Sequence, residues 1–344
     1  MMFMPCLLGL SLLHLEDLSA ILAMRLGPFP PLRALLVLAL GFIAAPLVIA
    51  GNLAIHIATR RAYPGLKMTA FAIVTIRAEM HQMGVREDPL SKRLLCAIPW
   101  VSPAARWAAY CHLYLAPLWQ WRTYPLSGSR LSQPSWRDVV SLRTMLIDDT
   151  LAASDAPQLV ILGAGFDSRA LMPSSKAASK WKRRFEVDFP PTQAAKRAAV
   201  EAADLDASAT TFVPCDFEHE SWLEKLVQAG FDKSQRAVFV WEGVTYYLEP
   251  AAVDATVALI KQCAPGSTVV FDFFTQELVE GRLIPLVASV LRRYGEPLKF
   301  GLGSEADERS AQTWANVHGL KLRECLKGGK KGARWGGVLS ADVQ

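Results

Sequence analysis

The sequence lacks the paired cysteines on which zinc sites and disulfide frameworks depend. Its six cysteines lie far apart and form no C-x-x-C motif: Cys6, Cys96, Cys111, Cys215, Cys263 and Cys325. This spacing predicts neither a metal site nor a disulfide-bonded fold, and it favours a reducing compartment.

A strong charge of either sign is also missing. The formal net charge is only +5, and no basic stripe interleaved with stacking aromatic residues occurs outside the apolar segments, so nucleic-acid binding is not predicted. The basic clusters at 180–184 and 327–334 are expected to be solvated turns, although either could contact phosphate or anionic lipid.

Hydrophobic residues, in contrast, make up 51% of the chain. Residues 34–51 contain no charged or strongly polar side chain, and the apolar character continues to Ala58. At about 1.5 Å per residue, 34–58 would extend roughly 37 Å, enough to cross a bilayer. We therefore expect an N-terminal extension, 1–67, with a transmembrane helix at 34–58. A buried or interfacial hairpin is the alternative.

Arginines flank this apolar run on both sides. Arg60 and Arg61 follow it directly, and Arg25 and Arg33 precede it. Their distribution slightly favours a cytoplasmic position for the C-terminal side. The expected localisation is thus the membrane, with the remaining chain in the cytoplasm.

Residues 68–134 form a second predicted segment, which is helical. Four tryptophans and several prolines occur within 94–121, so one long helix is not expected there. Short helices on a membrane surface, a cap over an active site and ordinary aromatic packing all fit this composition. A linker rich in Pro, Ser and Gly, 125–134, leads into a third segment, 135–344.

From Trp136 onward, predicted strands and helices alternate. The strands are expected at 158–162, 184–188, 211–213, 236–241, 267–273, 320–325 and 335–340, and helices at 191–203, 221–229 and 250–263. This alternation predicts an α/β fold with a mainly parallel sheet covered on both faces. Ligands of such folds bind at the carboxyl ends of the strands.

A glycine-rich turn ends the first of these strands. Gly163 and Gly165 allow a ligand to approach the main chain before a helix that we expect to begin near Ser168. Asp188 ends the next strand, roughly 20 residues later, where doubly wound folds place a ribose-binding carboxylate. Asp167 and Arg169 are interpreted as bracing the turn.

Three further acids lie at the ends of later strands, namely Asp216, Glu242 and Asp272. Isolated buried carboxylates are costly unless they are paired, so acids repeated along one edge indicate a site rather than core. An NAD-dependent oxidoreductase is disfavoured, because Ser168 replaces the third glycine of the dinucleotide fingerprint. None of the six histidines lies directly beside one of these acids or glycines.

Several ordered motifs resemble the leucine carboxyl methyltransferase family. They are LGAGFDSRA, FEVDFPPTQAAKR, FVPCDFEHESWLEKLVQAGFD, WEGVTYYLEPAAV and APGSTVVFDFF, and the resemblance extends from about Met68 to the C-terminus. It implies a class I S-adenosyl-L-methionine (SAM)-dependent methyltransferase, with a Rossmann-like, mainly parallel seven-stranded sheet behind a hydrophobic helical N-terminal extension. SAM is the implied cofactor.

The resemblance also implies roles for single residues. Gly163, Ala164 and Gly165 would pass beneath the methionine part of the donor, while Asp188 would hold the ribose hydroxyls and Asp216 would lie by the adenine. Glu242 would line the methionine end, and Arg143 would contact the donor carboxylate, as expected of a bidentate guanidinium.

The predicted catalytic residues are Glu242 and Tyr246. An aromatic ring attracts a cation, so Tyr246 could face the sulfonium, or it could simply pack the turn. Arg77 is a weaker candidate for the acceptor side.

The acceptor is expected to be a small or lipophilic molecule bearing a carboxylate. Methylation of a carboxylate needs no general base, because this nucleophile is already ionised. The family's best-known activity, esterification of a C-terminal leucine on a protein phosphatase, is the alternative. A membrane protein that binds SAM without turnover is a third possibility. Membrane association is expected, and the sequence leaves the oligomeric state open.

Overall fold

The computed structural model describes residues 30–66, 69–111, 113, 136–172, 180–217, 219–281, 292, 296–303, 307–327 and 336–344. The chain divides into two compact units. The first comprises 1–126 and 198–204, and the second comprises 127–197 and 205–344. The domain boundaries expected at 67 and 134 stay predictions. The predicted linker, 125–134, lies outside the described residues.

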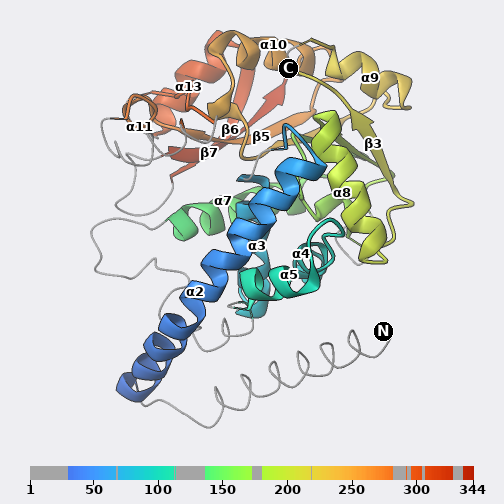
Figure 1. The fold of residues 1–344 in the computed structure, drawn as a ribbon. Coiled ribbons are helices and arrows are strands. Elements are labelled where there is room, and N and C mark those ends of the chain that lie inside the picture. Colours follow the sequence, from blue (N-terminus) through green and yellow to red (C-terminus); the bar gives the residue numbers. More distant parts are fainter. Residues whose placement is uncertain are drawn as a thin grey trace. The chain divides into compact units, whose positions relative to one another are not determined.

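The first unit is helical (Figure 1). Its described helices are α2 (Pro30–Ala62), α3 (Thr69–Gln82), α4 (Pro89–Cys96) and α5 (Pro103–Tyr110). Prolines begin α4 and α5, where a missing N–H costs nothing, and Asp88 and Ser102 cap these helices through their side chains. Within 94–121, Pro103 therefore acts as a helix start, and Pro99 lies in the turn between α4 and α5.

The second half of α2 packs as part of a protein core. Gly51, Ile55 and Thr59 recur every four residues, so they share one face of the helix, and all three are buried. A Cβ atom on Gly51 would lie 2.2 Å from the backbone nitrogen of Ala109 in α5. Trp100 donates a 2.9 Å hydrogen bond from Nε1 to Thr59 Oγ1, as in ordinary aromatic packing.

The transmembrane helix predicted at 34–58 is not supported. In the parts of the chain that the structure describes, none of the helices combines the length and the apolar character needed to cross a membrane. Packing within the first unit accounts for one apolar face of 44–59, because that face of α2 supplies buried contacts to α5.

The second unit is built on a seven-stranded sheet in the order β3-β2-β1-β4-β5-β7-β6. The strands are β1 (Gln158–Leu162), β2 (Arg183–Asp188), β3 (Thr210–Pro214), β4 (Ala237–Trp241), β5 (Thr268–Phe274), β6 (Leu320–Lys327) and β7 (Gly336–Val343). The first five pair in parallel, and β7 is antiparallel to both β5 and β6. The predicted α/β fold with a mainly parallel seven-stranded sheet is confirmed.

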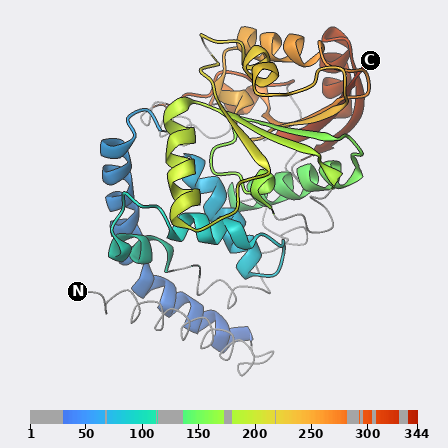
Figure 2. The ribbon, with the colours of Figure 1, turned by 90° about the vertical axis from the view of Figure 1, so that its right-hand side faces the viewer.

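Helices cover both faces of this sheet (Figure 2). The helices α9 (Trp222–Gln228), α10 (Pro250–Ile260) and α13 (Glu308–Val317) enclose the larger core with inward residues such as Trp222, Val257 and Ala315. On the other face, α7 (Trp136–Ala153) packs Ile147 and Leu151 against β1, β4 and β5. The strands β1, β4 and β5 are buried along their whole length, which explains their largely apolar sequences, whereas the edge strands β3 and β6 are partly exposed.

The remaining elements are short, apart from α8 (Pro190–Ala202). Two 3-10 turns, Arg169–Leu171 and Thr245–Tyr247, follow β1 and β4, and α11 (Gln276–Val279) follows β5. The helix expected to begin near Ser168 is only the first of these turns within the described residues. From β1 the chain proceeds to β2 and β3 on one side of the sheet, and then to β4 and β5 on the other. In such sheets, ligands bind at the carboxyl ends of the two strands where the direction changes, here β1 and β4.

Substitution of Gly51 tests the contact between α2 and α5. Alanine normally stabilises a helix interior by about 1 kcal/mol relative to glycine, but here its Cβ would overlap the α5 backbone. We expect Gly51→Ala to lower the free energy of unfolding by about 1–3 kcal/mol in urea denaturation. Asn52→Ala, at the exposed neighbouring position, should change it by less than about 0.5 kcal/mol. Equal stability of the two variants would contradict the described packing.

Candidate functional site

The turn after β1 depends on its two glycines. Gly163 and Gly165 have φ angles of 67° and 48°, which side chains disfavour. Gly163 N and Ala164 N donate hydrogen bonds of 2.8 and 3.2 Å to Val187 O in β2. A Cβ on Gly163 would lie 2.4 Å from Val244 Cγ2. The turn after β1 and the loop after β4 thus touch, and only glycine leaves room.

Asp188 lies directly beside this turn. Its carboxylate accepts hydrogen bonds from Gly165 N and, at 2.6 Å, from Phe189 N. Burial raises the pKa of Asp188 to about 6, although both backbone N–H groups act in the opposite direction. Asp188 O also accepts a 2.8 Å bond from Cys215 N, which brings the end of β3 alongside. A carboxylate so held is pre-oriented at the sheet edge.

A buried ion pair between Lys196 and Glu186 stabilises the same turn. Lys196 Nζ lies 2.5 Å from Glu186 Oε2 and donates a 2.5 Å hydrogen bond to Asp167 O. Both side chains are almost completely buried. Burial is the main reason that the pKa of Glu186 rises to about 7, and the Lys196 charge limits that rise. This pair was not predicted, although both residues lie in the FEVDFPPTQAAKR motif.

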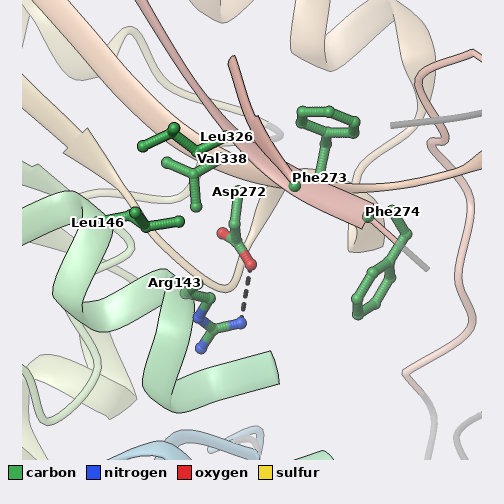
Figure 3. Close-up of a pocket in the computed structure, with 9 residues that line it drawn as sticks. Arg143, Leu146, Asp272, Phe273, Phe274, Leu326 and Val338 are labelled. Atoms are coloured by element: carbon green, nitrogen blue, oxygen red, sulfur yellow. Dashed lines mark hydrogen bonds and ion pairs between the residues drawn. The ribbon is translucent and has the colours of Figure 1, made fainter. Parts of the chain in front are cut away.

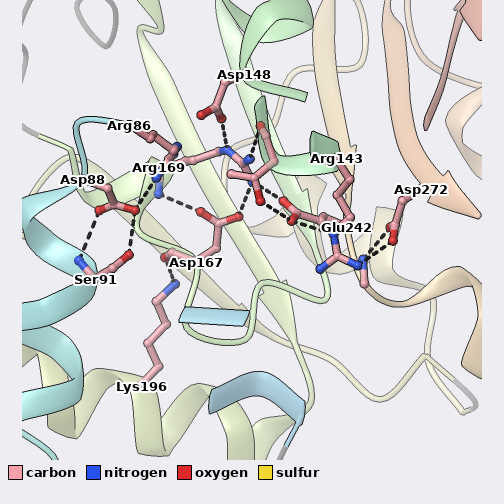
Figure 4. Close-up of polar contacts among 12 residues, drawn as sticks. Arg86, Asp88, Ser91, Arg143, Asp148, Asp167, Arg169, Lys196, Glu242 and Asp272 are labelled. Atoms are coloured by element: carbon pink, nitrogen blue, oxygen red, sulfur yellow. Dashed lines mark hydrogen bonds and ion pairs between the residues drawn. The ribbon is translucent and has the colours of Figure 1, made fainter. Parts of the chain in front are cut away.

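Arg169 joins three segments of the site (Figure 4). Its Nε donates to Asp148 Oδ1 of α7 at 2.6 Å, and its Nη1 to Asp167 Oδ2 at 2.8 Å and Glu242 Oε2 at 2.5 Å. Burial alone would lower the pKa of Arg169, but the three carboxylates raise it well above its ordinary value. Arg169 therefore fixes α7, the turn after β1 and the end of β4 together.

Arg143 occupies the other side of Glu242. Its Nε donates to Glu242 Oε1 at 3.0 Å, and its Nη1 to Tyr246 Oη at 3.0 Å and Asp272 Oδ2 at 2.7 Å. Burial would lower the pKa of Arg143, yet Asp272, Tyr246 and Glu242 raise it well above normal. Arg143 Nη2 is buried and has no hydrogen-bond partner among the described residues.

Asp272 in β5 anchors the loop after β4, which carries Glu242 and Tyr246. Its Oδ1 accepts a 2.6 Å bond from Gly243 N, and its carbonyl accepts one of the same length from Thr245 Oγ1. Figure 3 shows Arg143 and Asp272 facing each other beside a small pocket with mostly apolar walls. Its described lining residues are Arg143, Leu146, Asp272, Phe273, Phe274, Leu326, Gly336, Gly337 and Val338.

The charges of this cluster indicate which charges a bound ligand should carry. Four carboxyl groups surround two guanidinium groups, so negative charge is in excess. At the same time, Arg143 Nη2 offers an unsatisfied donor, and a buried donor without a partner costs about 1–3 kcal/mol. A ligand with both a carboxylate and positive charge satisfies both conditions, as the methionine part of SAM does.

The structure brings most of the predicted site residues to one sheet edge. Arg143, Glu242 and Tyr246 form one hydrogen-bonded cluster, and Gly165 contacts Asp188. Asp216 follows β3 on the neighbouring strand and pairs instead with His219 at 3.1 Å. Arg77 belongs to the first unit. The predicted roles of these residues stay predictions.

Two residues beside the site lacked a clear sequence signal. Arg169 was expected only to brace the turn, but it also contacts Glu242 and Asp148. Phe189 follows Asp188 directly and remains 38% exposed, which is unusual for a phenylalanine at the end of a buried strand.

The network around Arg169 can be tested by a substitution that keeps the charge. A lysine ammonium cannot reach three carboxylates in the planar geometry of a guanidinium. We expect Arg169→Lys to lower the free energy of unfolding by about 2–4 kcal/mol. Arg236→Lys, at an exposed pair with Asp155, should cost less than about 1 kcal/mol. Comparable losses in urea denaturation would show that Arg169 does not join the segments.

Comparisons with known proteins identify the family of this chain. The family model of leucine carboxyl methyltransferase matches residues 70–261. A Parafrankia protein, whose name places it among the SAM-dependent methyltransferases, is 30% identical over 77% of this chain and 79% of its own. A Mycobacterium avium protein with the same type of name is 28% identical over 66% and 72%.

Among solved structures, a DUF574 family protein from Streptomyces avermitilis aligns with a TM-score of 0.44. The two sequences are 13% identical, and the alignment covers 77% of this chain and 95% of the other. The strand arrangement, rather than this low similarity, identifies the fold. SAM is the cofactor of the sequence relatives, and its methionine part matches the charges at the sheet edge. The chain therefore belongs to the leucine carboxyl methyltransferase family of SAM-dependent methyltransferases.

Proposed function

We propose that the chain transfers the methyl group of SAM to the carboxylate of a small or lipophilic acid. The observation that carries the donor assignment is the cluster of Arg143, Arg169 and their four carboxylates. It combines an excess of negative charge with one unsatisfied buried donor. In the proposal, Arg143 Nη2 meets the donor carboxylate, and Glu242 contributes the negative charge that attracts the cationic methionine end.

The remaining donor contacts follow the sheet edge. Asp188 accepts hydrogen bonds from the ribose hydroxyls, as a carboxylate can, and Gly163, Ala164 and Gly165 allow close approach of the donor to the main chain. Asp216, at the end of the neighbouring strand, lies on the adenine side. Phe189 is suitably exposed to pack against the base.

The choice of a carboxylate acceptor rests on the lack of an available base in the described part of the site. Both oxygens of Asp272 and both oxygens of Glu242 are held by hydrogen bonds, mostly from the two arginines. Burial, followed by the Asp272 charge, raises the pKa of Tyr246 well above normal, so its hydroxyl stays protonated. A nucleophile that arrives ionised needs no deprotonation.

Bound SAM supplies an electrophilic methyl group, and the acceptor oxygen forms a bond to its carbon as the carbon–sulfur bond breaks. The sulfonium and carboxylate charges disappear together, so alignment contributes much of the acceleration. Glu242 acts as a fixed countercharge at this end of the site. Tyr246, stacked on Phe274 at 4.0 Å, holds Arg143 in place through its hydroxyl.

The pKa of Asp188 predicts how donor binding depends on pH. The ionised form accepts the ribose hydrogen bonds, and the carboxyl protonates at a pH of about 6. In calorimetric titrations, the Kd for SAM should therefore be flat above this pH and rise roughly tenfold per unit below it. Asp188→Asn should weaken binding and remove this dependence, whereas Asp155→Asn, at an exposed acid, should change neither. Unaltered affinity of Asp188→Asn would contradict the ribose assignment.

The acceptor class is tested with labelled methyl donor. Purified protein is incubated with lipophilic acids, with lipid extracts and with a peptide ending in leucine, and base-labile radioactivity is counted. Label in acids or extracts, but not in the peptide, is expected. Label only in the peptide would favour the protein carboxyl methyltransferase alternative. SAM binding without transfer to any acceptor would favour the non-catalytic one.

A further inference from the structure

An exposed apolar stripe runs along α2. Of the large hydrophobic side chains that the structure describes as exposed, four lie within eleven residues of this helix. Ile49, Leu53 and Ile57 recur every four residues and are 68%, 58% and 43% exposed, whereas Leu47, 42% exposed, lies on the opposite side of the helix, in line with Gly51. Side chains at this spacing share one helix face, so they form a continuous surface, which we call the α2 stripe.

The α2 stripe is not the packing face of the helix. Residues at 51, 55 and 59 are buried on α2, and they lie half a turn away from 49, 53 and 57. The helix is therefore apolar on two opposite faces, of which the first unit covers one. Burial within the unit explains the first face and leaves the second without a structural reason.

The charge around the stripe selects its occupant. Arg60 and Arg61 are exposed in the last turn of α2, and Arg60 continues the line of Ile49, Leu53 and Ile57. No acidic residue occurs in the sequence between Asp17 and Glu79. The stripe itself is aliphatic, whereas protein interfaces are enriched in aromatic residues. An aliphatic stripe ending in arginines is typical of a helix lying in a membrane interface.

We propose that the α2 stripe binds the surface of a bilayer containing anionic lipid, with α2 lying on the bilayer rather than crossing it. Ile49, Leu53 and Ile57 enter the boundary between headgroups and acyl chains, and Arg60 and Arg61 contact lipid phosphate. This inference is independent of the proposed reaction, because it concerns only the first unit.

Vesicle sedimentation of the full chain tests the proposal. Wild-type protein should partition onto vesicles of phosphatidylcholine and phosphatidylglycerol at least roughly tenfold more strongly than onto phosphatidylcholine alone, and 0.5 M salt should reduce this preference. The double substitution Ile49→Glu and Leu53→Glu should abolish binding. Arg60→Glu with Arg61→Glu should remove the preference for anionic vesicles. Val317→Glu, at an isolated exposed valine of α13, is the matched control and should bind like wild type.

Circular dichroism and SAM titration test whether the variants fold and bind donor normally. Both are expected to match wild type, because all the substituted positions are exposed. Vesicle binding that survives the double substitution would overturn the proposal, as would a wild-type chain that ignores anionic vesicles. Self-association that the double substitution abolishes, without vesicle binding, would instead assign the stripe to a second copy of the chain.

Discussion

The pairing of two buried arginines with four carboxyl groups is the interaction on which the second unit's site depends. Arg169 and Arg143 contact the two oxygens of Glu242, and so connect α7, the turn after β1, the loop after β4 and, through Asp272, strand β5. Buried charges tolerate little displacement, because each unpaired group would be expensive. The ion pairs therefore fix the carboxyl ends of the central strands, where the backbone leaves the sheet in irregular turns.

Much of this architecture was predictable because local signals agree with one another. Each of the seven strands was expected within a few residues of its observed position. The central strands β1, β4 and β5 are short apolar runs because both of their faces are buried. Gly163, Gly165 and Asp188 were also expected together, because strand ends in a parallel sheet meet at one edge. The order of the last strands was not predictable from periodicity, which carries no information on pairing.

The failures have physical reasons as well. Residues 34–58 suggested a membrane span because burial against protein and burial in lipid select the same side chains, and only Gly51 hints at a close helix neighbour. Arg169 was underrated because its partners, Asp148 and Glu242, are distant in sequence. Long-range pairing of charges leaves no local pattern, so the centre of the site became visible only in three dimensions.

The position of β7 has a consequence for biosynthesis. Although it follows β6 in the chain, it lies between β5 and β6, and Gly336 approaches Phe273 O so closely that a Cβ would lie 2.0 Å away. A nascent chain that has emerged only as far as β6 can pair its first five strands, but must hold β6 unpaired until the following strand leaves the ribosome. Until then the edge of β5 that β7 covers lacks its partner, so β6 cannot take its place in the sheet before β7 has paired with β5.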